Sequence, residues 1–316
     1  MLQAPYPKPK PKPIKLWDAF LGIVNANVLA ALLMSAVQAI AGGADAGFYG
    51  TAATVLIPLL MGFIAGATWR KLVLTSGQTA LLSFFNFVVG CAAAWFFVKE
   101  GVVCLVMASP LVFCLIWGGT ALGVSVCRPK TGNKPLAVSV VPVILAAMVW
   151  DCASPRQEQT RTVTTSVRVK ASAASVYPHM VKFSRIEASP TFLLNHVGLP
   201  YPLETTASGT HIGATRVCRF SDGIEIGERI TALEPGRRVA FTITEQPVYP
   251  EFTNHGHLLT GEMTVRDNGD GTATLSGTSV YALRVHPFWF FGWEADEIIH
   301  AVHRRVFSHI AWLSAK

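Results

Sequence analysis

The spacing of hydrophobic and polar residues divides the chain into two parts. Up to about residue 150 the apolar residues form long runs, whereas beyond it they alternate with Ser, Thr and charged residues. A helix that crosses a bilayer needs about 20 mainly apolar residues. Four runs reach this length, at 19–41, 49–68, 79–98 and 101–126, and a shorter run at 136–150 contains Pro142. These runs predict an all-α membrane bundle of about five transmembrane helices.

The first apolar run has two interpretations, a membrane anchor or a signal peptide. A long, proline-rich basic segment precedes it and further apolar runs follow it, so we interpret it as an anchor. The leading segment, residues 1–15, alternates Pro with Lys. It is expected to be an extended tail whose lysines lie against anionic headgroups. The transmembrane region is then expected to occupy residues 16–152.

Charge and composition set the expected location. Apolar residues make up 51% of the chain, and residues 1–150 hold ten Lys and Arg against three Asp and Glu, which accounts for the net charge of +7. These cations lie between apolar runs, so they indicate membrane orientation and exclude a nucleic-acid surface. The positive-inside rule places the N-terminus on the cytoplasmic side of a plasma or inner membrane. If the fifth run spans, the C-terminal domain is extracytoplasmic.

Polar residues inside the apolar runs are few. Asn25, Asn27 and Asn86 are uncharged, and no ionisable residue falls at the centre of a run. Ion or proton transport therefore has no residues to use, and we expect hydrogen bonds between helices instead.

Residues 161–316 are predicted to form an α+β domain after a linker at residues 153–160. Thr and Val at 162–170 predict a strand, and two short helices follow at 175–183 and 191–197. Turn signals then separate about six further strands between residues 203 and 284. We expect these strands to form an antiparallel meander.

The domain ends in a predicted long helix, which starts at Pro287 and runs to Leu313. Its helical period places one apolar stripe toward the sheet. The stripe consists of Phe288, Gly292, Ala295, Ile299, Val302, Val306, Ile310 and Leu313. The far side carries Glu294, Glu297, Ala301, Arg304 and Arg305. Glu297 is expected to form solvated charge pairs with Arg304 and Arg305.

This order of elements is that of the helix-grip fold, an antiparallel sheet wrapped on a long C-terminal helix. The segments VRVKASAASVYP at 167–178, ERITALEPGRRVAF at 228–241 and GDGT at 269–272, with the terminal helix, resemble the SRPBCC superfamily. That superfamily includes START lipid-transfer domains, polyketide cyclases and aromatases, and pollen-allergen-like ligand binders. The resemblance covers about residues 160–315 and implies an apolar cavity for a hydrophobic ligand. Its motifs are turn and core residues, so they identify the fold better than the activity.

The candidate ligand-binding residues lie on the predicted strands and on the terminal helix. They are Arg216, Glu228, Tyr281, Ile299, His303 and Val306. Which strand side chains face the cavity depends on the register, because a shift by one residue reverses every side chain.

Asp296, His300 and His303 form the sharpest titratable group. Their spacings of four and three place them on one flank of the helix, beside the apolar stripe. One interpretation is a polar patch at the cavity wall, with His303 exchanging a proton with the ligand and Asp296 orienting His300. The other is a surface ion pair of Asp296 with His300, with His303 bonded to a strand. We favour the second, because such a pair needs no catalysis to explain it.

Metal and cofactor sites are not expected. The spacing of Glu297 and His300 resembles that of carboxylate-bridged metal sites, but partner carboxylates are not evident. His255 and His257 lie in a loop, where histidines are usually solvated. The sequence contains no phosphate loop and no nucleophile elbow.

The start of the terminal helix is aromatic on every side. Phe288, Trp289, Phe290 and Trp293 are candidate membrane-docking residues, since aromatic rings suit the bilayer interface. Phe290 and Trp293 fall on the polar side of the helix and need a partner other than the sheet. The alternative partner is the 245–258 loop or the chain's own membrane helices.

The sequence therefore predicts membrane-anchored binding or transfer of a lipid-like molecule, with the bilayer and this ligand as partners. One alternative is a cyclase, aromatase or dehydratase that uses His303, His300 and either a strand acid or Tyr281, without a metal. Another is a sensor in which ligand occupancy alters the membrane helices. The sequence names no protein partner.

Overall fold

The computed structural model describes residues 16–40, 50–72, 74–98, 101–127, 135–155, 157–190, 194, 198–246 and 255–316. Two compact units make up the chain. One consists of Met1–Glu100 with Ala108–Pro155, and the other of Gly101–Met107 with Arg156–Lys316.

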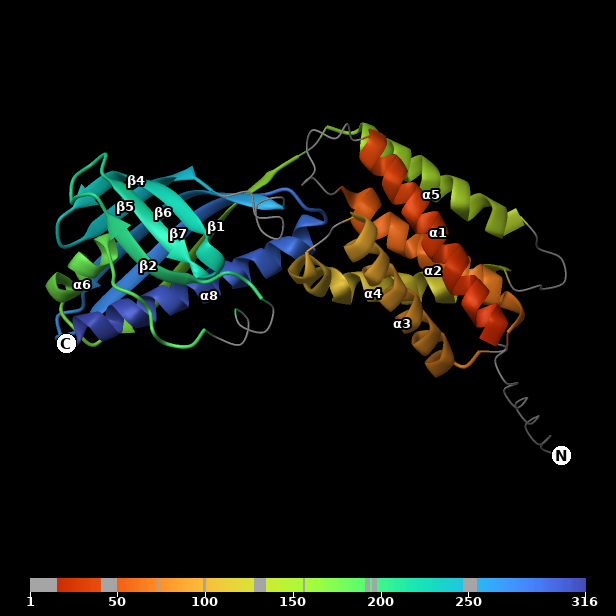
Figure 1. Ribbon diagram of the computed structural model, residues 1–316, viewed down its shortest axis with the longest axis horizontal. Coiled ribbons are helices and arrows are strands. Elements are labelled where there is room, and N and C mark those ends of the chain that lie inside the picture. Colours follow the sequence, from red (N-terminus) through yellow and green to blue (C-terminus); the bar gives the residue numbers. More distant parts are fainter. Residues whose placement is uncertain are drawn as a thin grey trace, which may run out of the picture. The chain divides into compact units, whose positions relative to one another are not determined.

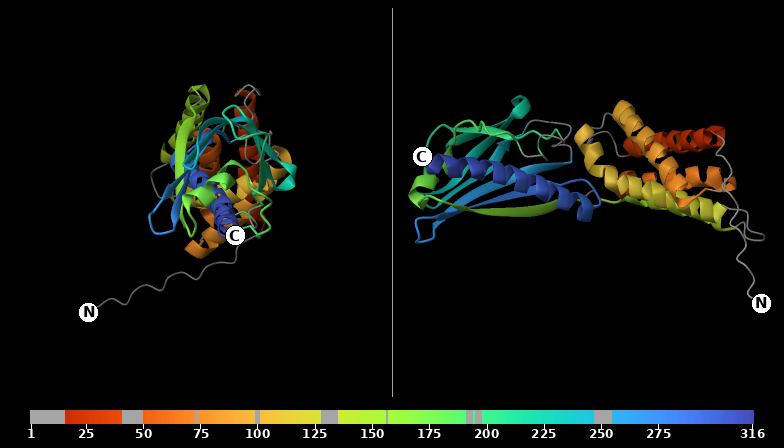
Figure 2. Two further views of the ribbon diagram at one scale, coloured as in Figure 1. Left: turned by 90° about the vertical axis from the view of Figure 1, so that its left-hand side faces the viewer. Right: turned by 90° about the horizontal axis from the view of Figure 1, so that it is seen from below.

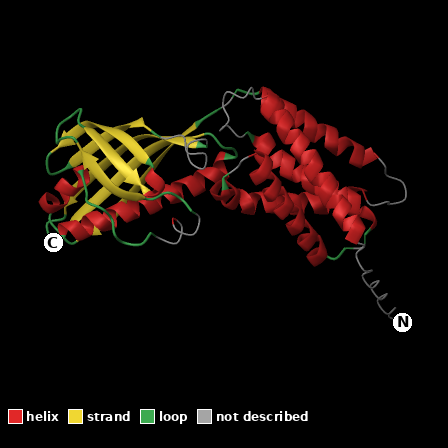
Figure 3. Cartoon of the chain, viewed as in Figure 1, coloured by secondary structure: helices red, strands yellow, loops and turns green. Residues whose placement is uncertain are grey.

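The first unit is helical (Figures 1 and 3). Its helices are α1 (Leu16–Ile40), α2 (Ile57–Thr68), α3 (Ser76–Ala93), most of α4 (Val102–Cys127), and α5 (Pro135–Ala153); π-helical turns at Ala52–Leu56 and Ala94–Val98 extend α2 and α3. Within the described residues, four segments are long and apolar enough to cross a membrane, namely Leu16–Ala36, Ala52–Lys71, Ser76–Phe97 and Val102–Cys127. The four longer runs of the sequence are thus confirmed as candidate spans.

The fifth apolar run is also helical, but it is shorter. Within α5 the apolar stretch Pro142–Asp151 does not reach the length of the other four. A crossing by α5 stays a prediction, and so does the orientation that depends on it.

Four glycines allow α2 and α4 to approach closely. They are Gly62 and Gly66 on α2, and Gly119 and Gly123 on α4, and a Cβ atom at any of them would lie 2.0 to 2.2 Å from a backbone oxygen of the facing helix. Small residues four apart on both helices are a common way for apolar helices to associate, because backbone contact replaces side-chain packing.

Polar side chains inside this unit bond between helices, as expected from the sequence. The Asn27 side-chain amide on α1 donates to Asn86 Oδ1 on α3 at 2.8 Å. The Ser83 hydroxyl on α3 donates to the Thr120 hydroxyl on α4 at 3.1 Å. At the end of α5, the Asp151 carboxylate accepts a hydrogen bond from the backbone N–H of Ala52 at 2.8 Å.

The second unit contains a curled antiparallel sheet of seven strands in the order β1-β7-β6-β5-β4-β3-β2 (Figure 2). The strands are β1 (Gln159–Val169), β2 (Pro202–Ala207), β3 (Thr215–Phe220), β4 (Glu225–Glu234), β5 (Arg238–Glu245), β6 (Gly256–Asp267) and β7 (Ala273–Leu283). Strands β2 to β7 form the predicted meander, and β1 pairs with β7 along its whole length.

Two helices accompany the sheet in the described part of this unit, α6 (Ala173–Val181) and α8 (Phe288–Ser314). The Ser172 hydroxyl caps α6 by accepting the Ser175 N–H at 3.2 Å. The second predicted short helix, 191–197, falls almost entirely outside the described residues. With α8 lying along the sheet, the unit is the predicted helix-grip domain (Figures 1 and 2).

The core of this domain lies between the sheet and the two helices. Its fully buried side chains include Val169, Val176, Met180, Ile230, Leu275, Phe307 and Ile310. Two glycines in the sheet leave room for aromatic rings. A Cβ atom at Gly277 would lie 2.3 Å from the ring of Phe307, and one at Gly261 would lie 2.4 Å from the ring of Phe241.

The side of α8 expected to be solvated is partly covered. Arg305 is 7% exposed, and its guanidinium donates to the backbone oxygens of Pro202 at 3.0 Å and Ala188 at 2.9 Å. Its guanidinium carbon lies 4.7 Å from the centre of the Tyr201 ring. The prediction of a solvated Arg305 was wrong, because the segment between α6 and β2 covers a second face of the helix.

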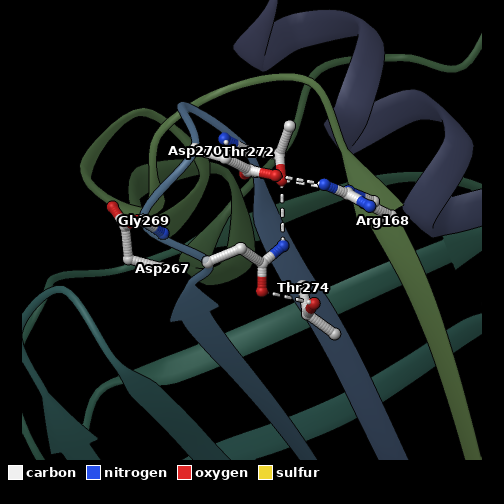
Figure 4. A network of polar contacts seen from close by, with 7 residues as sticks. Arg168, Asp267, Gly269, Asp270, Thr272 and Thr274 are labelled. Atoms are coloured by element: carbon white, nitrogen blue, oxygen red, sulfur yellow. Dashed lines mark hydrogen bonds and ion pairs between the residues drawn. The ribbon is translucent and has the colours of Figure 1, made fainter.

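A network of polar side chains fixes the turn between β6 and β7 (Figure 4). The Asn268 side-chain amide donates to the Thr272 hydroxyl at 3.0 Å, and Gly271 has a φ of 78°, which suits glycine. Arg168 of β1 reaches the same turn, where it donates to the Thr272 hydroxyl at 3.1 Å and pairs with Asp270. The turn thereby ties the end of β1 to the β6–β7 hairpin.

Candidate ligand-binding site

A cavity of about 100 Å³ lies between the sheet and α8. Much of its wall is apolar and includes Phe241, Met263, Val306 and Phe307, which come from β5, β6 and α8. The polar residues of the wall include Arg216, Glu228, Ser279 and His303. An apolar wall with a few polar groups is typical of a small-molecule site.

Arg216 and Glu228 form a buried ion pair in this wall. They face each other across β3 and β4, and their side chains are 2% and 7% exposed. Arg216 Nη1 donates to the Glu228 carboxylate, while Nε donates to the Val181 backbone oxygen at 2.9 Å. The guanidinium carbon lies 4.5 Å from the centre of the Phe241 ring. Burial raises the pKa of Glu228, and the charge of Arg216 partly offsets this effect.

His303 is held by hydrogen bonds at both ring nitrogens. Its Nδ1 lies 2.9 Å from the Thr165 hydroxyl of β1, and its Nε2 lies 2.9 Å from the Ser279 hydroxyl of β7. The ring stacks on Phe307 with a centroid distance of 5.5 Å. Burial, with a smaller contribution from the charge of His300, lowers the pKa of His303 to about 4. His303 is therefore neutral at pH 7.

Thr165 joins His303 to the other histidine of the predicted group. Its hydroxyl oxygen lies 2.7 Å from His300 Nδ1 as well as within hydrogen-bond distance of His303 Nδ1. Thr165 is 8% exposed, whereas His300 is only partly buried. The side chains of Ser279, His303, Thr165 and His300 thus form a continuous polar chain that begins at the cavity.

Asp296 has other partners than the sequence suggested. Its carboxylate accepts two hydrogen bonds from Arg161 of β1, at 3.2 Å from Nε and 2.5 Å from Nη2, and one from the Tyr281 hydroxyl at 2.8 Å. Burial, followed by the hydrogen bond to Asp296, raises the pKa of Tyr281. The expected pairing of Asp296 with His300 gives way to this arrangement, because a planar guanidinium binds a carboxylate through two parallel bonds.

The predicted ligand-binding residues are thus separated into two places. Arg216, Glu228, His303 and Val306 line the cavity. Tyr281 and Ile299 are not among the described residues that line the cavity. The Tyr281 hydroxyl binds Asp296 instead, and Ile299 is buried in the apolar stripe of α8.

Sequence reasoning did not identify Thr165, Ser279 or Arg161 as partners of the helix. All three lie on strands rich in Thr and Ser, where no sequence pattern distinguishes an inward polar side chain from an outward one. The pairing of β1 with β7 places Val163 opposite Ser279 and Thr165 opposite Gly277, and the hydrogen bonds of Thr165 and Ser279 to His303 show that this side of both strands faces α8.

No group of three or more His, Cys, Asp or Glu side chains is arranged to hold a metal ion within the described part of the chain. Neither Glu297 with His300 nor His255 with His257 belongs to such a group among these residues.

The aromatic start of α8 exposes two rings. Trp289 and Trp293 are 73% and 63% exposed, and their spacing of four residues puts them on one side of the helix. Phe290 is half-buried, with its ring 5.1 Å from that of Phe291. The exposed pair is therefore Trp289 with Trp293, where the helical wheel had indicated Phe290 with Trp293. Phe288 is also half-buried, and its ring lies 4.0 Å from that of His286.

Residues 160–310 match the family described as polyketide cyclase / dehydrase and lipid transport. This segment is the part of the chain in which the sequence resembles the SRPBCC superfamily, and the resemblance is confirmed for it. No curated protein matches the chain in sequence.

Several solved structures resemble the chain over about half its length. A protein from Nitrosospira multiformis is 16% identical, with 48% of this chain and 94% of that chain covered and a TM-score of 0.34. A protein from Chromobacterium violaceum is 15% identical, with 49% and 97% covered and a TM-score of 0.34. Norcoclaurine synthase from Thalictrum flavum is 13% identical, with 50% and 88% covered and a TM-score of 0.35.

Proposed function

We propose that this chain, whose residues 160–310 form a domain of the SRPBCC type, binds a hydrophobic small molecule at a membrane and carries or presents it there. The cavity between the sheet and α8 is the observation that supports the proposal most directly. It combines an apolar wall with a few buried polar groups at fixed positions. Such a wall favours an apolar ligand, while the polar groups select its orientation.

The size of the cavity limits the ligand. Pockets for drug-sized molecules measure about 300–1,000 Å³, whereas this cavity measures about 100 Å³. A single ring or a short chain matches the space as it stands. A longer lipid-like ligand requires side chains to rearrange, and the flexible side chain of Met263 and the helix residues Val302 and Val306 line the space that must widen.

The buried ion pair gives the cavity a polar wall without a net charge. Arg216 and Glu228 neutralise each other, so a neutral ligand meets their dipole and not a free charge. A ligand with an oxygen atom near this wall would gain a directed contact, while its hydrocarbon part gains about 0.8 kcal/mol for each CH₂ group that leaves water.

A location at the membrane would place such a domain close to hydrophobic ligands. The four apolar candidate spans of the first unit would hold the domain next to the bilayer, in which hydrophobic molecules are concentrated. We assign the exposed rings of Trp289 and Trp293 to the membrane interface, because indole rings favour the headgroup region.

Tryptophan fluorescence in proteoliposomes tests this docking. Brominated lipids quench the fluorescence of indoles that lie in the bilayer. The part of the wild-type fluorescence that disappears in the Trp289→Phe and Trp293→Phe variants should therefore be the part that these lipids quench. Trp312, which is 54% exposed near the other end of α8, provides the matched control. Docking is contradicted if the component removed by Trp312→Phe is quenched as strongly as that of Trp289 and Trp293.

Filling the cavity tests the binding site itself. Val306→Phe places a ring where the ligand is proposed to lie, and Val302→Phe does so at a half-buried position that tolerates a larger side chain better. Both should reduce uptake of 4-nitrophenol by the full chain in detergent at least tenfold, measured by equilibrium dialysis. Ser308→Phe, at an exposed position of the same helix, should leave uptake unchanged. Equal uptake by all four proteins would place the binding elsewhere.

A further inference from the structure

Three side chains, those of Ser279, His303 and Thr165, connect the cavity with His300, a partly buried histidine on α8. Ser279 Oγ lies 2.9 Å from His303 Nε2, His303 Nδ1 lies 2.9 Å from Thr165 Oγ1, and Thr165 Oγ1 lies 2.7 Å from His300 Nδ1. Ser279 and His303 line the cavity, and His300 is only partly buried. Each contact is within hydrogen-bond distance, so the chain is unbroken.

The number of available protons restricts how this chain can be arranged. A threonine hydroxyl has one proton, so Thr165 donates to one histidine and must accept from the other. The Nδ1 atom of one histidine is therefore protonated and that of the other is not. When both rings are neutral, His300 and His303 must adopt opposite tautomers.

Two arrangements satisfy this rule. In the first, Ser279 donates to His303 Nε2, His303 Nδ1–H donates to Thr165, and Thr165 donates to His300. The oxygen of Ser279 then accepts a hydrogen bond from a ligand hydroxyl. In the second arrangement every bond is reversed, His303 Nε2–H donates to Ser279, and the Ser279 hydroxyl donates to a ligand carbonyl or oxyanion.

We propose that Ser279, His303, Thr165 and His300 form a proton relay, and that the cavity takes a ligand with an acidic hydroxyl placed at Ser279. The inference rests on the proposed binding function and extends it by naming the reactive group of the ligand. The first arrangement fits the hydroxyl form of such a ligand, and the second fits its anionic form.

The transfer balances without any further reactant. The ligand O–H bond breaks and its proton passes to Ser279, whose own proton moves to His303 Nε2. His303 releases its Nδ1 proton to Thr165, which passes its proton to His300 Nδ1. The ligand oxygen keeps the electron pair as an oxyanion, and His300 becomes an imidazolium that can release its Nε2 proton to water. The reverse sequence protonates the ligand.

Because His303 is buried, its role in the relay is to pass a proton on and not to hold a positive charge. Its 9% exposure disfavours an imidazolium at this position, whereas exchange of one ring proton for another leaves the ring neutral throughout. The charged state arises at His300, which is more exposed. Arg161, which lies near this part of the helix, is already paired with Asp296.

Nitrogen-15 NMR of the histidine rings tests the relay in the full chain without any ligand. At about pH 8, above the ordinary histidine pKa, the ring shifts of His300 and His303 should report opposite tautomers. Thr165→Val removes the bridging hydroxyl at nearly constant shape and should release each ring to its own tautomer equilibrium. Thr164→Val, on the outward face of the same strand, is the matched control. Equal tautomers in the wild type, or no change in Thr165→Val, would overturn the relay.

The ionisation of bound 4-nitrophenol tests the assignment of the ligand group, because the phenolate is visible by its absorbance. Thr165 is not among the described residues that line the cavity, so Thr165→Val should still take up the neutral probe, and the phenolate fraction is compared on bound probe only. The fraction bound as phenolate should fall at least threefold in Thr165→Val only, and an unchanged fraction would contradict the relay. Absence of probe binding to the wild type would instead overturn the ligand class and the proposed cavity site, whatever the tautomers are.

Discussion

Arg216 is the side chain that connects the cavity wall to the core. It binds the Val181 backbone oxygen, the Glu228 carboxylate and the face of the Phe241 ring, while only 2% of its side chain is exposed. Removing an ion pair from water costs several kcal/mol per ion, and only well-placed partners compensate for it. The stability of this wall therefore depends on both charges being present together.

Removing one partner of the pair should cost more than removing both. Glu228→Ala leaves the buried guanidinium without its counter-ion, and we expect a loss of about 3–5 kcal/mol in the free energy of unfolding. The double variant Arg216→Met with Glu228→Leu leaves no uncompensated charge and should be clearly more stable than Glu228→Ala. Thermal unfolding of the full chain in detergent, followed by circular dichroism, measures the order. A double variant that unfolds at or below the temperature of the single one would contradict this reasoning.

At the scale of single residues, prediction succeeded where the helical period alone determines the face on which a residue lies. The period of the terminal helix placed His300 and His303 beside the apolar stripe, and both do contact the sheet. It did not find Thr165 or Ser279, since a strand of many Thr and Ser residues offers no signal for the inward face. The partner of Asp296 was missed for a related reason, because Arg161 is distant in sequence and only β1 brings it near.

At the scale of elements, the contact between α2 and α4 depends on glycines that remove side chains from the interface. Gly118 and Gly119 are neighbours on α4 with opposite surroundings. A Cβ atom at Gly119 would lie 2.2 Å from the Leu59 backbone oxygen, whereas Gly118 has no atom within 4 Å of such a position. The close contact therefore belongs to one face of α4.

The two neighbouring glycines provide a matched test. Gly119→Leu forces α2 and α4 apart and should lower the thermal midpoint of the first unit in detergent by several degrees, or abolish its folding. Gly118→Leu adds the same side chain on the open face and should fold with a nearly unchanged midpoint. If both substitutions have the same effect, helix propensity and not the close crossing sets the stability of this unit.

The elements themselves follow from sequence patterns, with one instructive failure. Apolar runs identified the long helices, and turn residues separated the six strands that follow β1. The helical wheel assigned Arg305 to solvent because it assumes that a helix buries one face. The chain before β2 covers a second face of α8, and contacts with Ala188 and Pro202 keep Arg305 buried. Such a covering segment has no periodicity of its own to reveal it.

At the scale of the whole molecule, the chain combines four apolar candidate spans with a domain of the SRPBCC type. The difference between the two units is visible in the sequence as a change of composition near residue 150, because the two units place their apolar side chains differently. The first carries large apolar side chains on its exposed surface, such as Leu32, Phe85 and Trp117, whereas the second hides an apolar interior behind a polar exterior. The size and occupancy of the cavity depend on packing between β3–β7 and α8 and are not visible in any sequence pattern.

Native mass spectrometry of the full chain, purified in detergent without added lipid, tests the proposed binding function most directly. The wild-type chain should retain a small hydrophobic molecule that appears as a discrete added mass, and solvent extraction should identify its chemical class. Val306→Phe should lose this mass, while Ser308→Phe should keep it. A wild-type chain that carries no such mass and takes up no 4-nitrophenol, or an identical added mass in all three proteins, would contradict ligand binding in this cavity.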